Sequence, residues 1–260
     1  MKKKLFIIGG AGNVYLQKLY MNSQAKDYKV SKFLVSQKMR KILGHTHHHF
    51  SAEDFLELEY TENIFSGIVL LIDLFFGKLF AKTLITEVDL NSFKCRPLLG
   101  ALFYVGYFQH KAKINFHANN ELIRADLSKP ALKYDLCIHF RGGDFIKYGS
   151  QLPPDYYRRA IDLIGSKVGL EYFKVAVVTN DRGFAVSQLE KISYNLDYSL
   201  ICGNAIDDIN SMMASKHLIT SNSTFSLIAA IERNEKGITV LPKEFSNNFL
   251  IKPNGSVFCL

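Results

Sequence analysis

The sequence is short of cysteine and has no cysteine pair at the spacing of a metal or redox motif. The four cysteines among its 260 residues are scattered along the chain, at Cys95, Cys137, Cys202 and Cys259. Cys137 sits in an apolar run typical of a buried strand, so buried free thiols in a reducing cytosol fit better than a disulfide framework. A small disulfide-stapled scaffold is therefore not expected.

A long apolar run is also missing. The basic start, MKKKLFIIGG (1–10), has too few apolar residues before its two glycines for a signal peptide. The most apolar segment, 64–80, includes Asp73 and Lys78 and falls short of a membrane span. It is either a buried helix, which its length favours, or a helix at a membrane interface. We expect a cytoplasmic chain, with peripheral contact to the inner face of the cell membrane as the open alternative.

Acidic residues are outnumbered by basic ones. The formal net charge is +8 and the isoelectric point is about 9.2. This balance suits an anionic partner, such as a nucleic acid, a phosphorylated small molecule or an anionic membrane. The basic residues are dispersed and no recognised nucleic-acid-binding motif is present, which argues against nucleic acid. A basic protein that is merely soluble is the plain alternative.

Buried strands alternate with helices, most clearly after residue 133. We predict strands at 5–10, 101–108, 134–140, 173–181, 198–203, 217–222 and 237–242, and helices at 11–26, 153–164, 206–216 and 223–234. This alternation predicts an α/β fold with a parallel sheet and helices on both faces. A change of domain is expected near 124–133, which divides the chain into 1–130 and 131–260.

Three polar clusters directly follow predicted strands: HFRGGD (139–144), TND (179–181) and SNSTFS (221–226). In parallel sheets, ligands bind beyond the carboxyl ends of the strands. We therefore expect the three clusters to converge on one crevice.

The first cluster has the chemistry of an anion site. Arg141 offers a planar fork of donors that suits phosphate oxygens. Gly142 and Gly143 allow a tight turn that brings backbone N–H groups close to an anion. The alternative is a plain strand–turn in which Arg141 and Asp144 form a solvated ion pair.

Three other motifs leave alternatives open. The polar run 220–226 either caps a helix or presents a helix N-terminus to a phosphate. GGAGN (9–13) lacks the spacing of a dinucleotide fingerprint. HTHHH (45–49) is either an exposed loop, which we favour, or a metal site. No D-x-D motif is present to hold a cation across a diphosphate.

Six short motifs occur in order along the chain: GGAGN (9–13), GYFQ (106–109), HFRGGDF (139–145), LPPDYYRRAI (152–161), TND (179–181) and SNSTFS (221–226). In that order they resemble the motifs of the α-1,2-fucosyltransferases of glycosyltransferase family 11, in their bacterial form. The resemblance extends from about residue 9 to residue 230 and so covers nearly the whole chain.

The resemblance implies a GT-B-like α/β fold with two Rossmann-like halves facing a central crevice. Residues 1–130 would form the acceptor-side half and 131–260 the half that binds the nucleotide sugar. The implied reaction is an inverting, metal-independent transfer of fucose from GDP-fucose to a glycan hydroxyl, in α-1,2 linkage and without a further cofactor. The implied acceptor is an oligosaccharide or lipid-linked glycan of bacterial surface polysaccharide synthesis, such as lipopolysaccharide O-antigen.

The clusters and the resemblance together give a candidate site without metal ligands. The candidate catalytic residues are Arg141, Asn13, His139 and Asp144, and the candidate donor-binding residues are Gly10, Gly12, Asp181, Ser221, Asn222, Ser223, Thr224 and Phe225. The resemblance implies that Arg141 binds the β-phosphate and that Asn13 faces the site from the other half. His139 and Asp144 are candidate general bases by proximity, each with a structural role as its alternative.

The chain departs from the family pattern at three places. Gly142 stands where the family has a second arginine, Val14 where it has glutamine, and LIAA (227–230) where it has Trp-Trp-Ala-Ala. These departures leave two alternatives open: a related transferase that uses another nucleotide sugar, and an inactive partner subunit.

Overall fold

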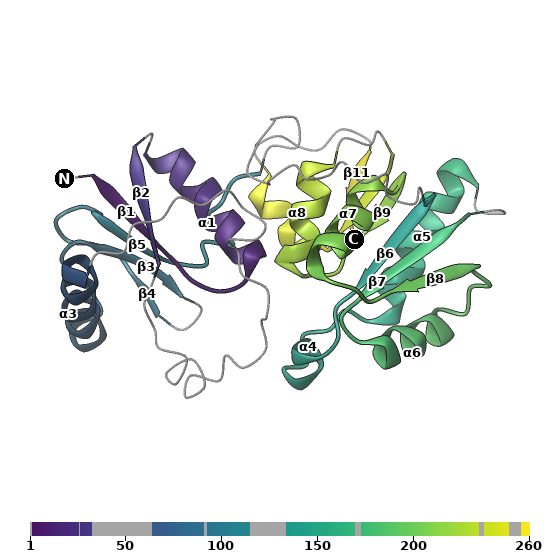
Figure 1. The fold of residues 1–260 in the computed structure, drawn as a ribbon, viewed down its shortest axis with the longest axis horizontal. Helices are drawn as coiled ribbons and strands as arrows, with labels where there is room; N and C mark the ends of the chain where they lie inside the picture. The colour runs from purple at the N-terminus through teal and green to yellow at the C-terminus, as the bar shows by residue number, and fades with distance from the viewer. Residues whose placement is uncertain are drawn as a thin grey trace. The chain divides into compact units, whose positions relative to one another are not determined.

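The computed structural model of the chain describes residues 2–25, 27–32, 64–90, 93–114, 134–169, 173–233, 237–249 and 256–260 (Figure 1). The chain divides into two compact units, unit 1 (Met1–Lys113) and unit 2 (Ile114–Leu260). Each unit has its own sheet, and most strand pairs in both sheets are parallel. The predicted α/β class is therefore confirmed.

Unit 2 has a six-stranded sheet in the order β11-β10-β9-β6-β7-β8, and every neighbouring pair is parallel. Its strands are β6 (Leu136–Phe140), β7 (Val175–Thr179), β8 (Tyr198–Ile201), β9 (His217–Ile219), β10 (Thr239–Leu241) and β11 (Val257–Cys259). Its helices are α4 (Asp144–Lys147), α5 (Pro154–Val168), α6 (Arg182–Ile192), α7 (Ala205–Ala214), α8 (Thr224–Glu232) and the 3-10 helix η2 (Lys243–Asn248).

The strand order of unit 2 contains one reversal. The chain runs outward from β6 through β7 to β8, then returns to β9 on the other side of β6 and continues to β10 and β11. This is the doubly wound Rossmann order, in which ligands bind at the carboxyl ends of the strands beside the reversal. In unit 2 the reversal lies between β6 and β9.

The core of unit 2 follows from the alternation of side chains along β6. Leu136, Ile138 and Phe140 belong to a buried cluster that includes Tyr157 of α5 and Leu189 of α6. Because successive strand residues point to opposite faces, Cys137 and His139 lie on the other face, where α7 contacts β6 and β7 and packs against α8. Helices therefore cover both faces of this sheet, as the sequence predicts.

Unit 1 has a five-stranded sheet in the order β2-β1-β5-β3-β4, in which only the β3–β4 pair among the described strands is antiparallel. Its elements are β1 (Lys3–Ile7), α1 (Ala11–Gln24), β2 (Tyr28–Lys32), α3 (Ile64–Phe80), β3 (Thr86–Leu90), β4 (Phe93–Cys95) and β5 (Phe103–Gly106). The strand predicted at 101–108 is confirmed as β5. The strands β2, β3 and β4 are not among the sequence predictions.

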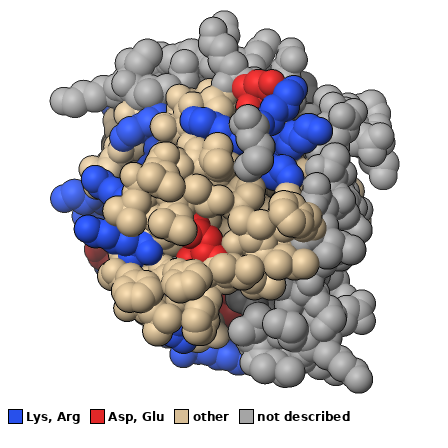
Figure 2. All heavy atoms as spheres, turned by 90° about the vertical axis from the view of Figure 1, so that its left-hand side faces the viewer, with Lys and Arg blue, Asp and Glu red and all other residues tan. Residues whose placement is uncertain are grey.

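Helix α3 corrects one expectation, because it is not a buried helix. Its inner face packs against the sheet of unit 1, where Leu70 lies in a cluster with Phe6, Phe103 and Val105. Its outer face is exposed although its side chains are apolar. Figure 2, which turns the left-hand side of Figure 1 toward the viewer, shows that this side of the molecule is mostly uncharged. In the part of the chain that the structure describes, no helix is both long and apolar enough to cross a membrane.

Asp73, on the inner face of α3, explains how an acid is accommodated in so apolar a segment. Its carboxylate accepts hydrogen bonds from the backbone N–H groups of Leu84 (2.8 Å) and Ile85 (3.2 Å). A buried carboxylate is stable when it has such donors. Asp73 therefore ties α3 to the segment that leads into β3.

Candidate functional site

Three loops of unit 2 lie at one edge of its sheet. Residues 141–143 follow β6, residues 180–181 follow β7, and residues 220–223 connect β9 to α8. Because β6, β7 and β9 are adjacent and parallel, their carboxyl ends point to the same edge. The three polar clusters of the sequence therefore meet beside the strand-order reversal, as predicted.

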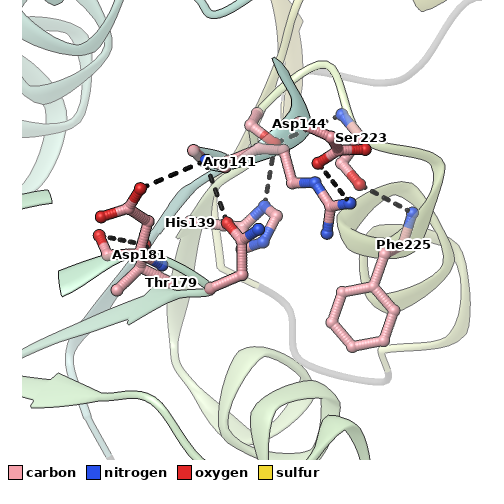
Figure 3. Close-up of polar contacts among 11 residues, drawn as sticks. His139, Arg141, Asp144, Thr179, Asp181, Ser223 and Phe225 are labelled. Carbon is pink, nitrogen blue, oxygen red and sulfur yellow. Dashed lines mark hydrogen bonds and ion pairs between the residues drawn. The ribbon is translucent and has the colours of Figure 1, made fainter. Parts of the chain in front are cut away.

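Arg141 is the cation at this edge. Its Nη2 is 2.9 Å from Oδ1 of Asp144, and its guanidinium lies 5.2 Å from the ring centre of Phe145. The side chain is 17% exposed, and its buried Nε has no hydrogen-bond partner among the described residues. A buried N–H group without an acceptor costs free energy, and an oxyanion of a ligand would satisfy it. In Figure 3 the guanidinium points toward the start of α8.

The two glycines after Arg141 do not act as expected. The N–H of Gly142 donates to Oδ1 of Asn180 (2.9 Å), and the N–H of Gly143 donates to Oδ2 of Asp181 (3.3 Å). Both N–H groups are thus taken by side chains of the neighbouring loop and are not directed at an anion. The glycines instead allow the β6 and β7 loops to pack closely together.

Close approach explains why glycine occupies position 142. A Cβ added there would lie 2.7 Å from Cβ of Asp181 and 3.0 Å from the ring of Phe184. Gly143 has a φ of 60°, in the region that favours glycine. An arginine at position 142, as in the family pattern, therefore requires a different spacing between these two loops.

Asp181 is fully engaged in holding the β7 loop (Figure 3). It is the N-cap of α6, where Oδ1 accepts from the N–H of Phe184 (3.0 Å), while Oδ2 accepts from Gly143. Thr179 adds two hydrogen bonds to the backbone of Asp181, each 3.0 Å long. These contacts support a positioning role, and contact between Asp181 and the donor stays a prediction.

His139 lies on β6, facing α8, and is almost completely buried. Its Nδ1 is 2.9 Å from Oγ of Ser221, which follows β9 on the other side of the reversal. Burial, together with the nearby Arg141 cation, lowers the pKa of His139 to about 3. The imidazole is therefore neutral at pH 7, and its contacts are those of a group that joins β6 to the β9 loop.

The segment after β9 is held mostly by its own side chains. Ser221 Oγ accepts from the N–H of Ser223 (3.2 Å), and Ser223, the N-cap of α8, accepts from the N–H of Phe225 (3.3 Å). Thr220 is buried, and its carbonyl accepts from the hydroxyl of Tyr156. Two of the N–H groups expected to bind phosphate thus have acceptors within the segment. The positive end of the α8 dipole still lies here, beside Thr224.

Asn222 differs from its neighbours because the oxygen of its side-chain amide has no hydrogen-bond partner among the described residues. Its Nδ2 donates to the carbonyl of Ser150 (2.7 Å), which fixes the orientation of the amide. Its Oδ1 is buried and has no donor among the described residues. This oxygen accepts hydrogen bonds, so it suits a hydroxyl or N–H group of a ligand and does not suit a phosphate oxygen.

In unit 1, the motifs GGAGN and GYFQ come together at the ends of the adjacent strands β1 and β5. The side chain of Gln109 donates to Oδ1 of Asn13 (2.8 Å). Gly9 has a φ of 84°, and a Cβ there would lie 2.7 Å from Nδ2 of Asn13. Gly10 is the N-cap of α1, and Gly12 is buried in the first turn of that helix. Asn13 thus lies in the first turn of α1 with its side chain held by Gln109, and its role in the reaction stays a prediction.

Three residues of the site were not singled out from the sequence. Asn180, Ser150 and Gln109 each hold a loop or a candidate residue through one hydrogen bond. Asn180 and Gln109 lie inside the quoted motifs TND and GYFQ, so a polar residue in a strand-end motif was the available signal. Ser150 lies outside the quoted motifs and has no such signal.

Metal-binding residues do not gather in the described parts of the chain, where no group of three or more His, Cys, Asp or Glu side chains could hold an ion. The segment HTHHH (45–49) lies outside the described residues, so the metal alternative for it stays open.

Comparison with known proteins finds one family model, Glycosyl transferase family 11, which matches residues 101–258. No curated protein matches the chain in sequence. The chain is similar to a solved structure of POFUT1 in complex with GDP, with 10% identity and a TM-score of 0.45 over 92% of this chain and 96% of that one. It is also similar to E. coli heptosyltransferase WaaC with ADP-2-deoxy-2-fluoro heptose, with 10% identity and a TM-score of 0.40 over 100% of this chain and 93% of that one.

Proposed function

Because the chain belongs to glycosyl transferase family 11, we propose that it is an inverting transferase that moves fucose from GDP-fucose to a glycan hydroxyl in α-1,2 linkage. Because it belongs to this family, the protein is a glycosyltransferase that uses a nucleotide sugar. The donor sugar, the linkage and the nucleotide rest on the resemblance of the motifs to the fucosyltransferases of that family.

The observation that carries the proposal is the position of Arg141. A largely buried arginine with an unpaired Nε lies at the carboxyl end of β6, beside the strand-order reversal where Rossmann folds bind nucleotides. The N-terminus of α8 begins at the same edge of the sheet. A diphosphate bound here would meet a cation and the positive end of a helix dipole.

This arrangement matches what sugar transfer demands. The bond to the anomeric carbon breaks as negative charge builds on the β-phosphate, so preorganised donors aimed at that phosphate lower the barrier. Arg141 supplies such donors without a metal ion. Asp144 holds the guanidinium in place through its 2.9 Å ion pair, which supports a positioning role for Asp144.

Unit 2 is proposed to bind the donor and unit 1 the acceptor. In unit 2, Asn222 Oδ1 would accept from a donor hydroxyl or a base N–H, and His139 would keep the β6 and β9 loops in register through Ser221. In unit 1, Asn13, whose side chain accepts a hydrogen bond from Gln109, is the candidate residue for contact with the acceptor. A lipid-linked glycan of a bacterial surface polysaccharide is the proposed acceptor.

The test is thermal unfolding of the purified chain with GDP, UDP, CDP and their sugars. A ligand that binds only the folded state raises the free energy of unfolding, by about 2.7 kcal/mol at a hundred times its Kd. We expect GDP and GDP-fucose to raise the unfolding temperature and the other nucleotides to leave it unchanged. Stabilisation by UDP or CDP without GDP would reject GDP-fucose as the donor.

A further inference from the structure

The outer face of α3 is a large apolar surface. Eight large hydrophobic side chains on this helix are between 44% and 75% exposed: Phe65, Ile68, Leu71, Ile72, Phe75, Phe76, Leu79 and Phe80. Their spacing of three and four residues places them on one side of the helix. A helix on the surface of a water-soluble domain normally presents polar residues on that side.

The same surface continues beyond the helix. Leu84, Leu98 and Leu99 are 50%, 58% and 77% exposed. The N–H of Leu99 donates to the carbonyl of Leu84, and the N–H of Leu98 donates to the carbonyl of Thr83, so the two loops lie together. Asp73 of α3 binds the N–H of Leu84, which holds these loops against the helix. We call α3 with Leu84, Leu98 and Leu99 the apolar face.

Within the described ranges 64–90 and 93–100, the charged side chains that the structure exposes to solvent are basic. Lys78, Lys82, Lys94 and Arg96 are exposed. In the ranges 64–90 and 93–100, the acids Asp73 and Asp89 are buried, and Glu87 is ion-paired with Lys111. Figure 2 shows Lys and Arg side chains around much of the edge of a mostly uncharged surface, with acidic atoms visible near its middle and at its upper edge. The apolar face thus has a rim of cations and no exposed acid in those ranges.

We propose that the apolar face docks the protein onto the surface of an anionic phospholipid bilayer, with α3 lying in the plane of the interface. A helix of 17 residues is about 25 Å long, so it lies along the interface with its exposed side in the acyl region. The rim cations then reach the anionic headgroups. This role goes beyond the proposed sugar transfer and does not depend on it.

The rim of charge favours a bilayer over a second copy of this chain. In a twofold dimer the same surface meets itself, so the cations at the edges of the two apolar faces would approach one another. Like charges in such an interface oppose association. An anionic bilayer offers the opposite charge at the edge and an apolar medium in the middle.

The test measures binding of the full chain to vesicles of phosphatidylcholine with 30% phosphatidylglycerol. The buffer contains ~0.1 M salt, so that charges on the protein are screened beyond a short distance. The wild type should sediment with these vesicles, and less with pure phosphatidylcholine. The variant Leu71→Ser/Phe75→Ser/Leu79→Ser should bind about a hundredfold more weakly, because three exposed apolar groups no longer enter the acyl region. The variant Lys82→Glu/Arg96→Glu should bind at least about thirtyfold more weakly and be less sensitive to salt than the wild type.

A matched control replaces exposed apolar residues of unit 2, in Val168→Ser/Tyr198→Ser/Ile206→Ser, and should bind vesicles as the wild type does. Transfer to a water-soluble acceptor should be the same in the serine variant of α3 and the wild type, which separates this test from that of the proposed function. Three results overturn the proposal: a wild type that does not bind vesicles, a serine variant that binds equally, or a wild type that dimerises through α3 in place of binding vesicles.

Discussion

Unit 1 and unit 2 use their surfaces in opposite ways. In unit 2, the polar side chains at the strand ends bind the backbone or the side chains of neighbouring loops, and the largely buried Arg141 keeps an unpaired Nε among the described residues. In unit 1, the outer side of α3 leaves large apolar groups exposed. A rigid polar edge suits recognition of a charged small ligand, whereas an apolar face suits contact with an extended apolar medium. Substitutions on each of the two surfaces can test whether this division holds.

The largest effect is expected on turnover from Arg141→Ala. Removing one preorganised donor from the developing charge costs about 100-fold to 1000-fold in rate. The free energy of unfolding should change by less than about 1 kcal/mol, because the ion pair with Asp144 is partly exposed. Steady-state transfer assays and urea unfolding measure the two quantities. Arg158→Ala, on the exposed side of α5, is the matched control and should keep full activity. Near-native turnover of Arg141→Ala would contradict the proposal that this edge of the sheet is the donor-binding site.

Adjacent leucines of α3 should differ strongly in their effect on stability. Leu70 is fully buried against the sheet of unit 1, and Leu71 is 54% exposed. Leu70→Ala should lower the free energy of unfolding by about 2–5 kcal/mol, since it leaves a cavity. Leu71→Ala should change it by less than about 0.5 kcal/mol. Chemical denaturation compares the two, and equal losses would show that the outer side of α3 is packed against protein.

Gly142→Ala should destabilise unit 2 by about 1–3 kcal/mol. The new methyl group would lie 2.7 Å from Cβ of Asp181 and would push the β6 and β7 loops apart. Gly183→Ala is the control, because a Cβ there meets no atom closer than 3.8 Å and alanine favours the helix. If Gly142→Ala were as stable as the wild type, the β6 and β7 loops would not be packed as closely as described.

The pH dependence of stability tests the burial of His139 in unit 2. Burial lowers the pKa of His139 to about 3, whereas an unfolded histidine has a pKa of about 6.5. Below about pH 6, the unfolded state binds a proton that the folded state does not, so stability falls as the pH falls. The slope is about 1.4 kcal/mol per pH unit down to the folded pKa. Urea unfolding between pH 7 and pH 4 should show a shallower slope for His139→Gln than for the wild type. If His139→Gln had the same slope as the wild type, the imidazole of His139 would not be buried as a neutral group.

Much of unit 2 could be predicted from the sequence because its strands β6, β7, β9 and β10 are buried on both faces and its helices alternate with the strands. Pro154 at the start of α5 and the polar residues before α8 mark two helix starts correctly. The pairing of Arg141 with Asp144 was also within reach, because the two lie three residues apart. Contacts between residues of different strands could not be predicted from the sequence. Ser221 contacts His139 only because β6 and β9 are neighbouring strands.

Unit 1 was harder to predict for a physical reason. The run 64–80 has the same composition whether it is buried or lies at an interface, so periodicity alone cannot distinguish the two. The role of Gly142 was hidden in the same way, since its neighbours Asp181 and Phe184 come from the next strand loop. In both cases the deciding contact lies outside the local sequence.

The central claim is that Arg141 holds the diphosphate of the donor in unit 2. Its most direct test is calorimetric titration of GDP into the wild type and into Arg141→Ala, with Arg158→Ala as the control. We predict that GDP binds the wild type and the control alike, and binds Arg141→Ala at least about tenfold more weakly, which corresponds to 1.4 kcal/mol. Equal affinity of GDP for all three proteins would contradict the claim.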